Sequence, residues 1–262
     1  MSVAAEHVTP TTVPSTATAG MLARMLGVEL ADELRGILRE PTAWFFSILM
    51  PVGFFALFGS LFGGADPRAG TMMLATYGTF GVLSVCLMNP GIGVAADRER
   101  GWLKAKLVSA VPVTITLAAK MLAALPYALG VLAAMTLTAW AVGFLTATPL
   151  ELLKLGGAVL LGALPFSLLG LAVGFQAKGS ATAAILNAIL LPSAIAAGLW
   201  FPLDIMPRFV QTLAPFLPTY HLGRLALSQV TGDPAGVHAL ALVAMTLVMA
   251  AVAAVSYRFA RS

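Results

Sequence analysis

Charged residues are scarce in this sequence. Only 10% of its 262 residues are Asp, Glu, Lys or Arg, whereas 59% are hydrophobic, and a soluble globular protein carries about 25% charged residues. A soluble core of this length does not need so much apolar surface, so the excess must face an apolar solvent such as lipid. The net charge of +4 is modest, and no basic face is interleaved with aromatic residues, which argues against binding of nucleic acid.

Cysteine and the common catalytic motifs are also nearly absent. Because Cys86 is the single cysteine of the sequence, an intrachain disulfide and a Cys-based metal cluster are excluded. The three histidines, His7, His221 and His238, have no metal-ligand spacing. No stretch matches the phosphate-binding loop G-x-x-x-x-G-K-[ST], and the hydrolase motifs G-x-S-x-G and H-E-x-x-H are missing. We therefore predict no catalytic residues, no metal site and no ATP hydrolysis by this chain alone.

Long apolar runs make up most of the chain. A membrane-spanning helix needs about 20 mostly apolar residues, and spans are helical because lipid offers the backbone no hydrogen-bond partner. No carboxylate lies near the middle of a run, which argues against a proton-driven carrier. Six runs qualify, at residues 43–62, 71–96, 121–147, 155–177, 179–203 and 236–257. The predicted fold is an all-α, polytopic membrane protein with six transmembrane helices.

The distribution of Lys and Arg predicts the orientation. If the N-terminus is cytoplasmic, eleven of these residues fall inside and four fall outside, as the positive-inside rule requires. Six spans then place both termini in the cytoplasm, and we expect a bacterial cytoplasmic membrane. The predicted domains are a disordered tail at 1–19, an amphipathic interfacial helix at 20–41 and a six-helix transmembrane domain at 42–262.

The segment 20–41 has the period of an amphipathic helix. Apolar residues recur every four positions, and charged residues occupy the other face. Such a helix should lie on the cytoplasmic membrane surface, either as a simple anchor or as a contact for a partner. Its apolar positions are Leu22, Leu26, Leu30, Leu34 and Leu38, with Met25 and Ile37 beside them.

The cytoplasmic link 97–112 predicts a short charged helix between two spans. Asp97 and Glu99 are expected at its start, where negative charge is favoured, and Pro112 should end it. An isolated helix of this length is marginal in water, so something must pack on it. A solvated loop carrying positive-inside charge is the alternative.

The outer segment 204–234 contains four prolines yet stays apolar between them. It is too short for two spans and suits a pair of short re-entrant or interfacial helices. Non-helical backbone at membrane depth survives only when it is buried in protein or lines a wet cavity. A plain outer loop is the alternative.

Small residues spaced four apart permit two helices to pack closely, as at Gly170 and Gly174. The packing partner could be a helix of this chain or a helix of a second copy.

Two stretches make the chain resemble the ABC-2 type permeases, the membrane subunits of type-2 ATP-binding-cassette exporters. The first runs from Arg98-Glu99-Arg100-Gly101 to Pro112, with Trp102 where the family often has Thr. The second runs from Gly198-Leu199-Trp200-Phe201-Pro202 to Leu217-Pro218. The resemblance extends from about Leu22 to the last span.

The resemblance implies a coupling helix that docks on an ATPase subunit, and outer re-entrant helices after the fifth span. The coupling residues would be Asp97, Arg98, Glu99, Arg100, Gly101, Leu103, Leu107 and Pro112. The outer segment would include Pro202, Asp204, Pro207, Pro215 and Pro218. Asn89 and Asn187, like Gln176, are uncommon polar residues in or near spans, and could contact substrate or bond between helices.

The implied function is export of an amphipathic or lipophilic cargo, such as a drug, antibiotic or lipid. The expected partners are two copies of an ATP-binding-cassette ATPase subunit, a second permease copy or a sister permease, and membrane lipid. ATP and Mg would be bound by the ATPase, so no cofactor is expected in this chain. Export of a lipid-linked glycan and a non-transporting membrane sensor or assembly protein are the alternatives.

Overall fold

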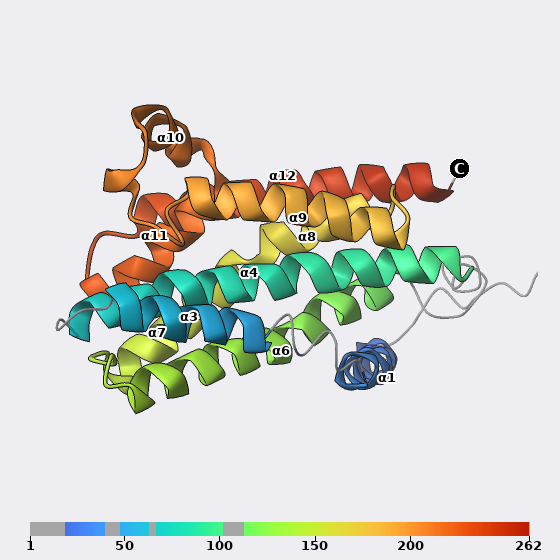
Figure 1. The fold of residues 1–262 in the computed structure, drawn as a ribbon. Helices are drawn as coiled ribbons and strands as arrows, with labels where there is room; N and C mark the ends of the chain where they lie inside the picture. Colours follow the sequence, from blue (N-terminus) through green and yellow to red (C-terminus); the bar gives the residue numbers. More distant parts are fainter. Residues whose placement is uncertain (1–18, 40–47, 63–66, 102–112, 262) are drawn as a thin grey trace, which may run out of the picture.

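The long helices of this chain lie alongside one another and alternate in direction (Figure 1). The computed structural model describes residues 19–39, 48–62, 67–101 and 113–261, and every regular element within these ranges is helical. The α-helices are α1 (Ala19–Leu38), α3 (Met50–Phe62), α4 (Pro67–Glu99), α6 (Val113–Ala141), α7 (Pro149–Gly162), α8 (Leu164–Gly174), α9 (Gly179–Ala196), α10 (Arg208–Leu213), α11 (Pro218–Thr231) and α12 (Gly236–Arg261). Two short 3-10 helices lie at Leu203–Ile205 and Ala214–Phe216.

Five stretches among the described residues are long and apolar enough to cross a membrane. They are Arg68–Glu99, Val113–Ala141, Pro149–Gly174, Gly179–Ala196 and Gly236–Ala260. The all-α, multi-pass prediction is therefore confirmed. The apolar helix at Pro51–Leu61 is shorter, and the start of the predicted span 43–62 lies outside the described residues, so the sixth crossing stays a prediction.

The second predicted span runs further than its apolar stretch. Helix α4 continues through Asp97 and ends at Glu99, so the expectation that these two carboxylates begin a new helix is wrong. Negative charge is unfavourable at the C-terminal end of a helix, and contacts from other helices offset it, as described below. The rest of the link lies outside the described residues, and with it Leu103, Leu107 and Pro112.

The fourth predicted span, 155–177, corresponds to two helices in tandem. Helix α7 starts earlier, at Pro149, with a capping box in which Thr148 and Glu151 satisfy each other's backbone N–H groups. Ala163 then separates α7 from α8, which has Pro165 in its first turn. A proline is tolerated there because its missing N–H would have no partner in a first turn anyway.

Helix α4 lies at the centre of the bundle and touches α8 backbone to backbone. A Cβ added to Gly170 would overlap the carbonyl oxygen of Leu87, and one added to Gly174 would overlap that of Gly91. Only glycine permits so close an approach. The Gly170 and Gly174 pair therefore serves packing within the chain.

Helix α1 lies across one end of the bundle and is seen end-on in Figure 1. No residue of α1 is buried, but most of its regularly spaced leucines are half-buried, while Leu38 is exposed. The structure has a helix at Ala19–Leu38, where the sequence predicts the amphipathic helix, and its role as an interfacial helix at a membrane surface stays a prediction. The predicted disordered tail falls almost wholly on residues that the structure does not describe, 1–18.

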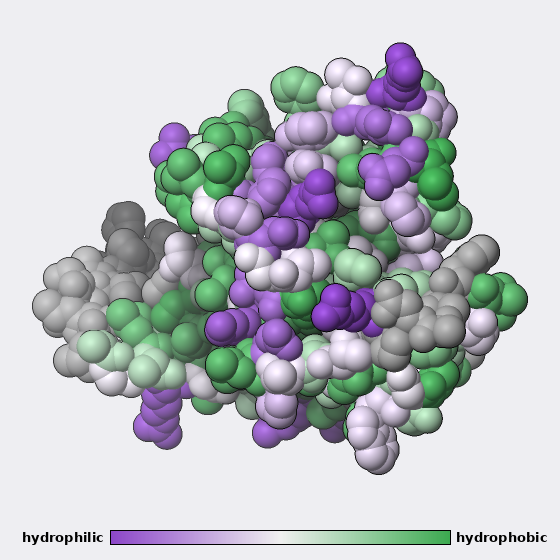
Figure 2. Space-filling model, turned by 90° about the vertical axis from the view of Figure 1, so that its left-hand side faces the viewer, coloured by the Kyte–Doolittle hydropathy of each residue, from purple (hydrophilic) through white to green (hydrophobic). Residues whose placement is uncertain are grey.

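The opposite end of the bundle carries α10 and α11, so the segment 204–234 does form two short helices. Helix α11 packs into the bundle through buried residues such as Leu222 and Ala226, whereas α10 has no buried residue. Figure 2 looks onto this end and shows polar residues gathered near its middle, with apolar residues around them. Whether the two helices enter the membrane stays a prediction.

Candidate functional site

Four parts of the chain converge at the end of the bundle that carries α1. They are α1 itself, the last turn of α4, the first turns of α6 and the turn between α8 and α9. The C-terminal end of α12 lies at the same end (Figure 1). The last turn of α4 is the first part of the predicted coupling stretch, so its contacts decide what a movement of that stretch would displace.

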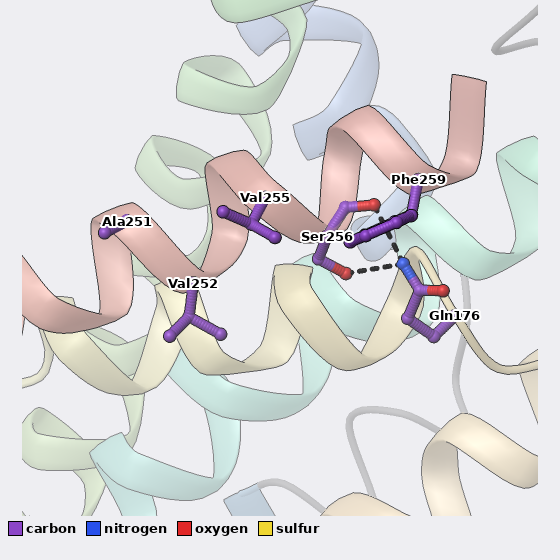
Figure 3. Close-up of a pocket in the computed structure, with 6 residues that line it drawn as sticks. All are labelled: Gln176, Ala251, Val252, Val255, Ser256 and Phe259. Atoms are coloured by element: carbon purple, nitrogen blue, oxygen red, sulfur yellow. Dashed lines mark hydrogen bonds between the residues drawn. The ribbon is translucent and has the colours of Figure 1, made fainter. Parts of the chain in front are cut away.

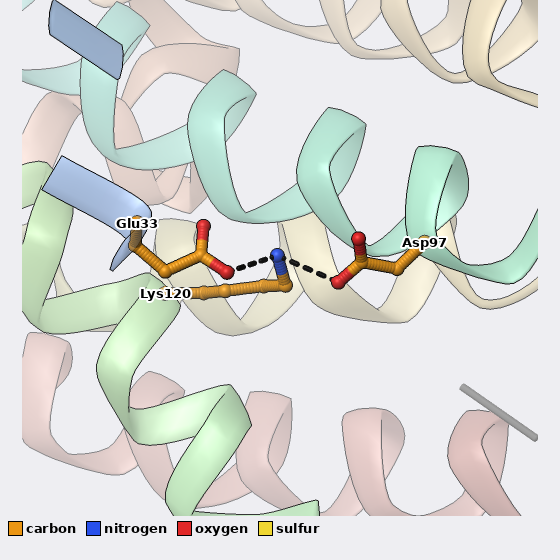
Figure 4. A network of polar contacts seen from close by, with 3 residues as sticks. All are labelled: Glu33, Asp97 and Lys120. Carbon is orange, nitrogen blue, oxygen red and sulfur yellow. Dashed lines mark hydrogen bonds and ion pairs between the residues drawn. The ribbon is translucent and has the colours of Figure 1, made fainter. Parts of the chain in front are cut away.

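The centre of this site is Lys120 on α6, which pairs with two carboxylates from two other helices (Figure 4). Its Nζ lies 2.6 Å from Oε1 of Glu33 on α1 and 2.9 Å from Oδ2 of Asp97 on α4. The lysine side chain is only 5% exposed, while the carboxylates are 24% and 25% exposed. Burial of an unpaired ammonium would be very unfavourable, so the three helices are held together by this cation.

Helix packing makes the space that Lys120 occupies. Its Nζ lies 3.3 Å from the position where a Cβ on Gly93 of α4 would stand. Gly93 precedes Asp97 by four residues, so both lie on the face of α4 that looks toward α6. A larger side chain at Gly93 would crowd the ammonium group directly.

The next two residues of α4 bind the turn between α8 and α9. The guanidinium of Arg98 donates from Nη2 to the carbonyl oxygen of Ala177, at 2.8 Å. Oε1 of Glu99 accepts from the backbone N–H of Gly179, at 3.2 Å. A cation next to the C-terminal end of α8 and an anion at the N-terminus of α9 both match the helix dipoles.

Three consecutive residues of the predicted coupling stretch therefore hold three different neighbours. Asp97 reaches α6, and through Lys120 it is linked to α1, while Arg98 and Glu99 reach the α8–α9 turn. Arg100 is exposed. Gly101 follows with φ +75°, the left-handed conformation that commonly follows a helix end.

The predicted outer residues lie at the other end of the bundle. Pro207 and Pro218 stand at the starts of α10 and α11, and Pro202 precedes the 3-10 helix that contains Asp204. Pro215 belongs to the second 3-10 helix, and its carbonyl lies 3.0 Å from Nε2 of His221. Their placement is that of helix starts and turns, and whether they form a re-entrant segment stays a prediction.

The polar residues in the spans differ in what they contact. Nδ2 of Asn187 donates to Ala183 of the same helix, and the side chain is exposed on α9. Nδ2 of Asn89 is buried and has no partner among the described residues. Gln176 does bond between helices, since its Nε2 donates to the carbonyl and hydroxyl oxygens of Ser256, both at 2.8 Å.

The pairing of Glu33 with Lys120 was not predicted from the sequence. The sequence feature that could have suggested this pair is that both charged residues lie next to apolar stretches. Glu33 lies on the polar face of α1, and Lys120 lies one residue before the run 121–147. No group of three or more His, Cys, Asp or Glu residues able to hold a metal ion occurs in the part of the chain that the structure describes.

The fold and this site define a multi-pass helical membrane protein whose charged end ties several helices together. The sequence matches the family described as ABC-2 type transporter over residues 26–231, and the chain belongs to this family. It is also similar to YvfS of Bacillus subtilis (strain 168), described as a candidate transport permease, with 28% identity over 203 residues, which is 76% of this chain and 83% of that protein. The chain is thus a transmembrane subunit of an ABC transporter, and the family implies a separate ABC ATPase subunit as its partner.

Proposed function

We propose that this chain exports an amphipathic or lipophilic cargo, such as a drug, an antibiotic or a lipid, out of a bacterial cytoplasm. Two ATPase subunits would dock on the link 97–112 of two permeases, either two copies of this chain or one copy and a sister permease. The observation that carries the proposal is the set of contacts made by Asp97, Arg98 and Glu99, which connect the start of the link to α1, α6 and the α8–α9 turn.

These contacts would convert a push on the link into a shift of several helices at once. Rigid helices that repack between two arrangements are a common basis for switching in proteins. Lys120 cannot lose either carboxylate without a penalty, because it is nearly buried. A displacement of Asp97 would therefore move α6 and α1 with α4, and the contacts of Arg98 and Glu99 would carry α9 along.

The exposed face of α9 supports a second permease or a cargo path beside this helix. Asn187 lies near the middle of the candidate span Gly179–Ala196 and is exposed, as are Ala184 and Ala188. An amide facing lipid at that depth is unfavourable, and small residues permit close approach of another helix. We therefore place the partner permease or the cargo against this face.

The test is reconstitution of the chain with its ATPase partner in liposomes, with ATP hydrolysis and cargo movement measured together. The variant combines Arg98→Glu, Glu99→Arg and Leu107→Ala. We expect cargo-stimulated ATP hydrolysis to be lost while the complex still assembles. Unchanged stimulation would rule out the coupling assignment. ATP turnover without movement of any amphipathic cargo would favour a non-transporting sensor or assembly protein.

A further inference from the structure

A groove runs along α12 beside the turn that follows α8 (Figure 3). Its volume is about 430 Å³, within the range of ligand pockets, which is roughly 300 to 1,000 Å³. It is open along one side, and apolar atoms make up nearly all of its lining. The lining residues are Gln176, Ala251, Val252, Val255, Ser256 and Phe259.

Hydrogen bonds fix the inner wall of this groove. Gln176 donates to both oxygens of Ser256, as the dashed lines in Figure 3 mark. The hydroxyl of Ser256 donates in turn to the carbonyl oxygen of Ala172 on α8, at 2.7 Å. The wall is therefore held in place by the contact between α8 and α12 and does not depend on the rotamers of free side chains.

The open side of the groove lies on a surface that a membrane would cover. It belongs to the candidate span Gly236–Ala260, and the side chains of Ala251, Val252, Val255 and Phe259 are all exposed. In a bilayer, an apolar groove along a span offers a complementary surface to an acyl chain. A soluble ligand would have to reach it through lipid.

Positive charge stands where the groove meets the charged end of the bundle. Arg258 follows Val255 by three residues and Ala251 by seven, so it lies on the same side of α12. Lys178 follows Gln176 by two residues, and both basic side chains are exposed. Neither α12 nor the segment from Phe175 to Ala196 contains an acidic residue. The nearby Glu99 already accepts a hydrogen bond from Gly179.

We propose that this groove is a binding site for an anionic phospholipid of the leaflet at the charged end of the bundle. One acyl chain lies along Val252 and Val255, and the headgroup phosphate is bound by Lys178 and Arg258. Basic positions between helices at the membrane surface attract anionic headgroups. The inference needs only the membrane location of the chain and does not depend on what the transporter carries.

The experiment uses the purified full chain in a neutral detergent and titrates phosphatidylglycerol or phosphatidylcholine with identical acyl chains. Bound lipid is counted by native mass spectrometry, and thermal unfolding is followed in parallel. We expect preferential retention of phosphatidylglycerol. Each basic residue near a membrane surface contributes about 1 kcal/mol, so Lys178→Gln with Arg258→Gln should weaken its binding about thirtyfold.

Two further variants separate the groove from general electrostatics. Val255→Trp fills the groove without changing charge and should reduce lipid retention, whereas Lys154→Gln with Arg208→Gln removes the same charge at the opposite end and should not. Equal retention of the two lipids, or an equal loss in the control pair, would overturn the proposal. So would full competition by soluble glycerol phosphate, because the site would then recognise a free phosphate and not a lipid.

Discussion

Nζ of Lys120 lies 2.9 Å from Oδ2 of Asp97, although Asp97 begins the link 97–112 and Lys120 lies beyond its end, on α6. The ion pair thus joins α4 to α6, the helices on either side of the link. The same ammonium also holds Glu33 of α1. Any partner that moves the link acts on a closed loop of chain whose two ends cannot separate freely.

Lys120→Met should destabilise the protein strongly. It removes the cation and leaves Glu33 and Asp97 facing each other, which should cost about 2–3 kcal/mol, less than for a fully buried pair because the carboxylates are partly exposed. The measurement is thermal unfolding in detergent. The matched control is Arg35→Gln, which breaks an exposed pair with Asp32 and should cost less than about 1 kcal/mol. Equal losses in both variants would contradict the role of Lys120.

Gly174→Ala should weaken the contact between α4 and α8. The new Cβ would overlap the carbonyl oxygen of Gly91, and overpacking of this kind costs about 1–3 kcal/mol. Gly157→Ala is the control, because a Cβ there meets open space and alanine favours the helix by up to about 1 kcal/mol. The measurement compares the unfolding midpoints of the two variants in detergent. An unchanged midpoint for Gly174→Ala would show that α4 and α8 can move apart at little cost in free energy.

The bundle was predictable because lipid imposes strong rules on sequence. Apolar length alone located five of the spans, and the period of four predicted α1. Boundaries were less accurate, since α4 carries charged residues past the apolar run and α7 starts six residues before the expected Leu155. Helix ends depend on contacts such as that between Asp97 and Lys120, which join residues far apart in the chain and leave no local signal.

The exposed face of α9 should be shielded in the assembled transporter. A spin label on Ala188→Cys should collide with dissolved oxygen several-fold less often than one on Leu240→Cys, which lies on α12 and is 71% exposed. Electron paramagnetic resonance in lipid measures this directly. Cys86 is buried, so it should contribute little background labelling. Equal oxygen access at both positions would mean that lipid covers α9.

His221 and His238 should be energetically coupled. Their Nδ1 atoms lie 3.0 Å apart and join α11 to α12, and the ring of Tyr220 contacts both imidazoles. A cycle of His221→Ala and His238→Ala, measured by unfolding, should give a coupling of about 0.5–1.5 kcal/mol. His238→Ala combined with Arg208→Gln serves as the control and should be additive. A coupling near zero for the histidines would show that α11 is held by its apolar contacts alone.

The site itself was only partly predictable. The sequence pointed to Asp97, Arg98 and Glu99 through the family resemblance, and the structure describes these three as bound to other helices. The sequence did not point to Glu33, because its partner lies on a different helix. In the sequence, Glu33 is only one of several charged residues on the polar face of α1. The spacing of charges along one helix cannot reveal which distant helix will pack beside it.

The glycine contact between α4 and α8 limits how the transporter can move. The two helices touch along Gly91 and Gly174, and Arg98 and Glu99 hold the turn at the end of α8 to the same α4. These contacts join α4 and α8 into one rigid unit, which is fixed along the length of the two helices and at the charged end of the bundle. Changes of shape during transport would then move α4 and α8 as one unit, with α1, α6 and α9 following through their contacts with the last turn of α4, and without sliding of α8 along α4.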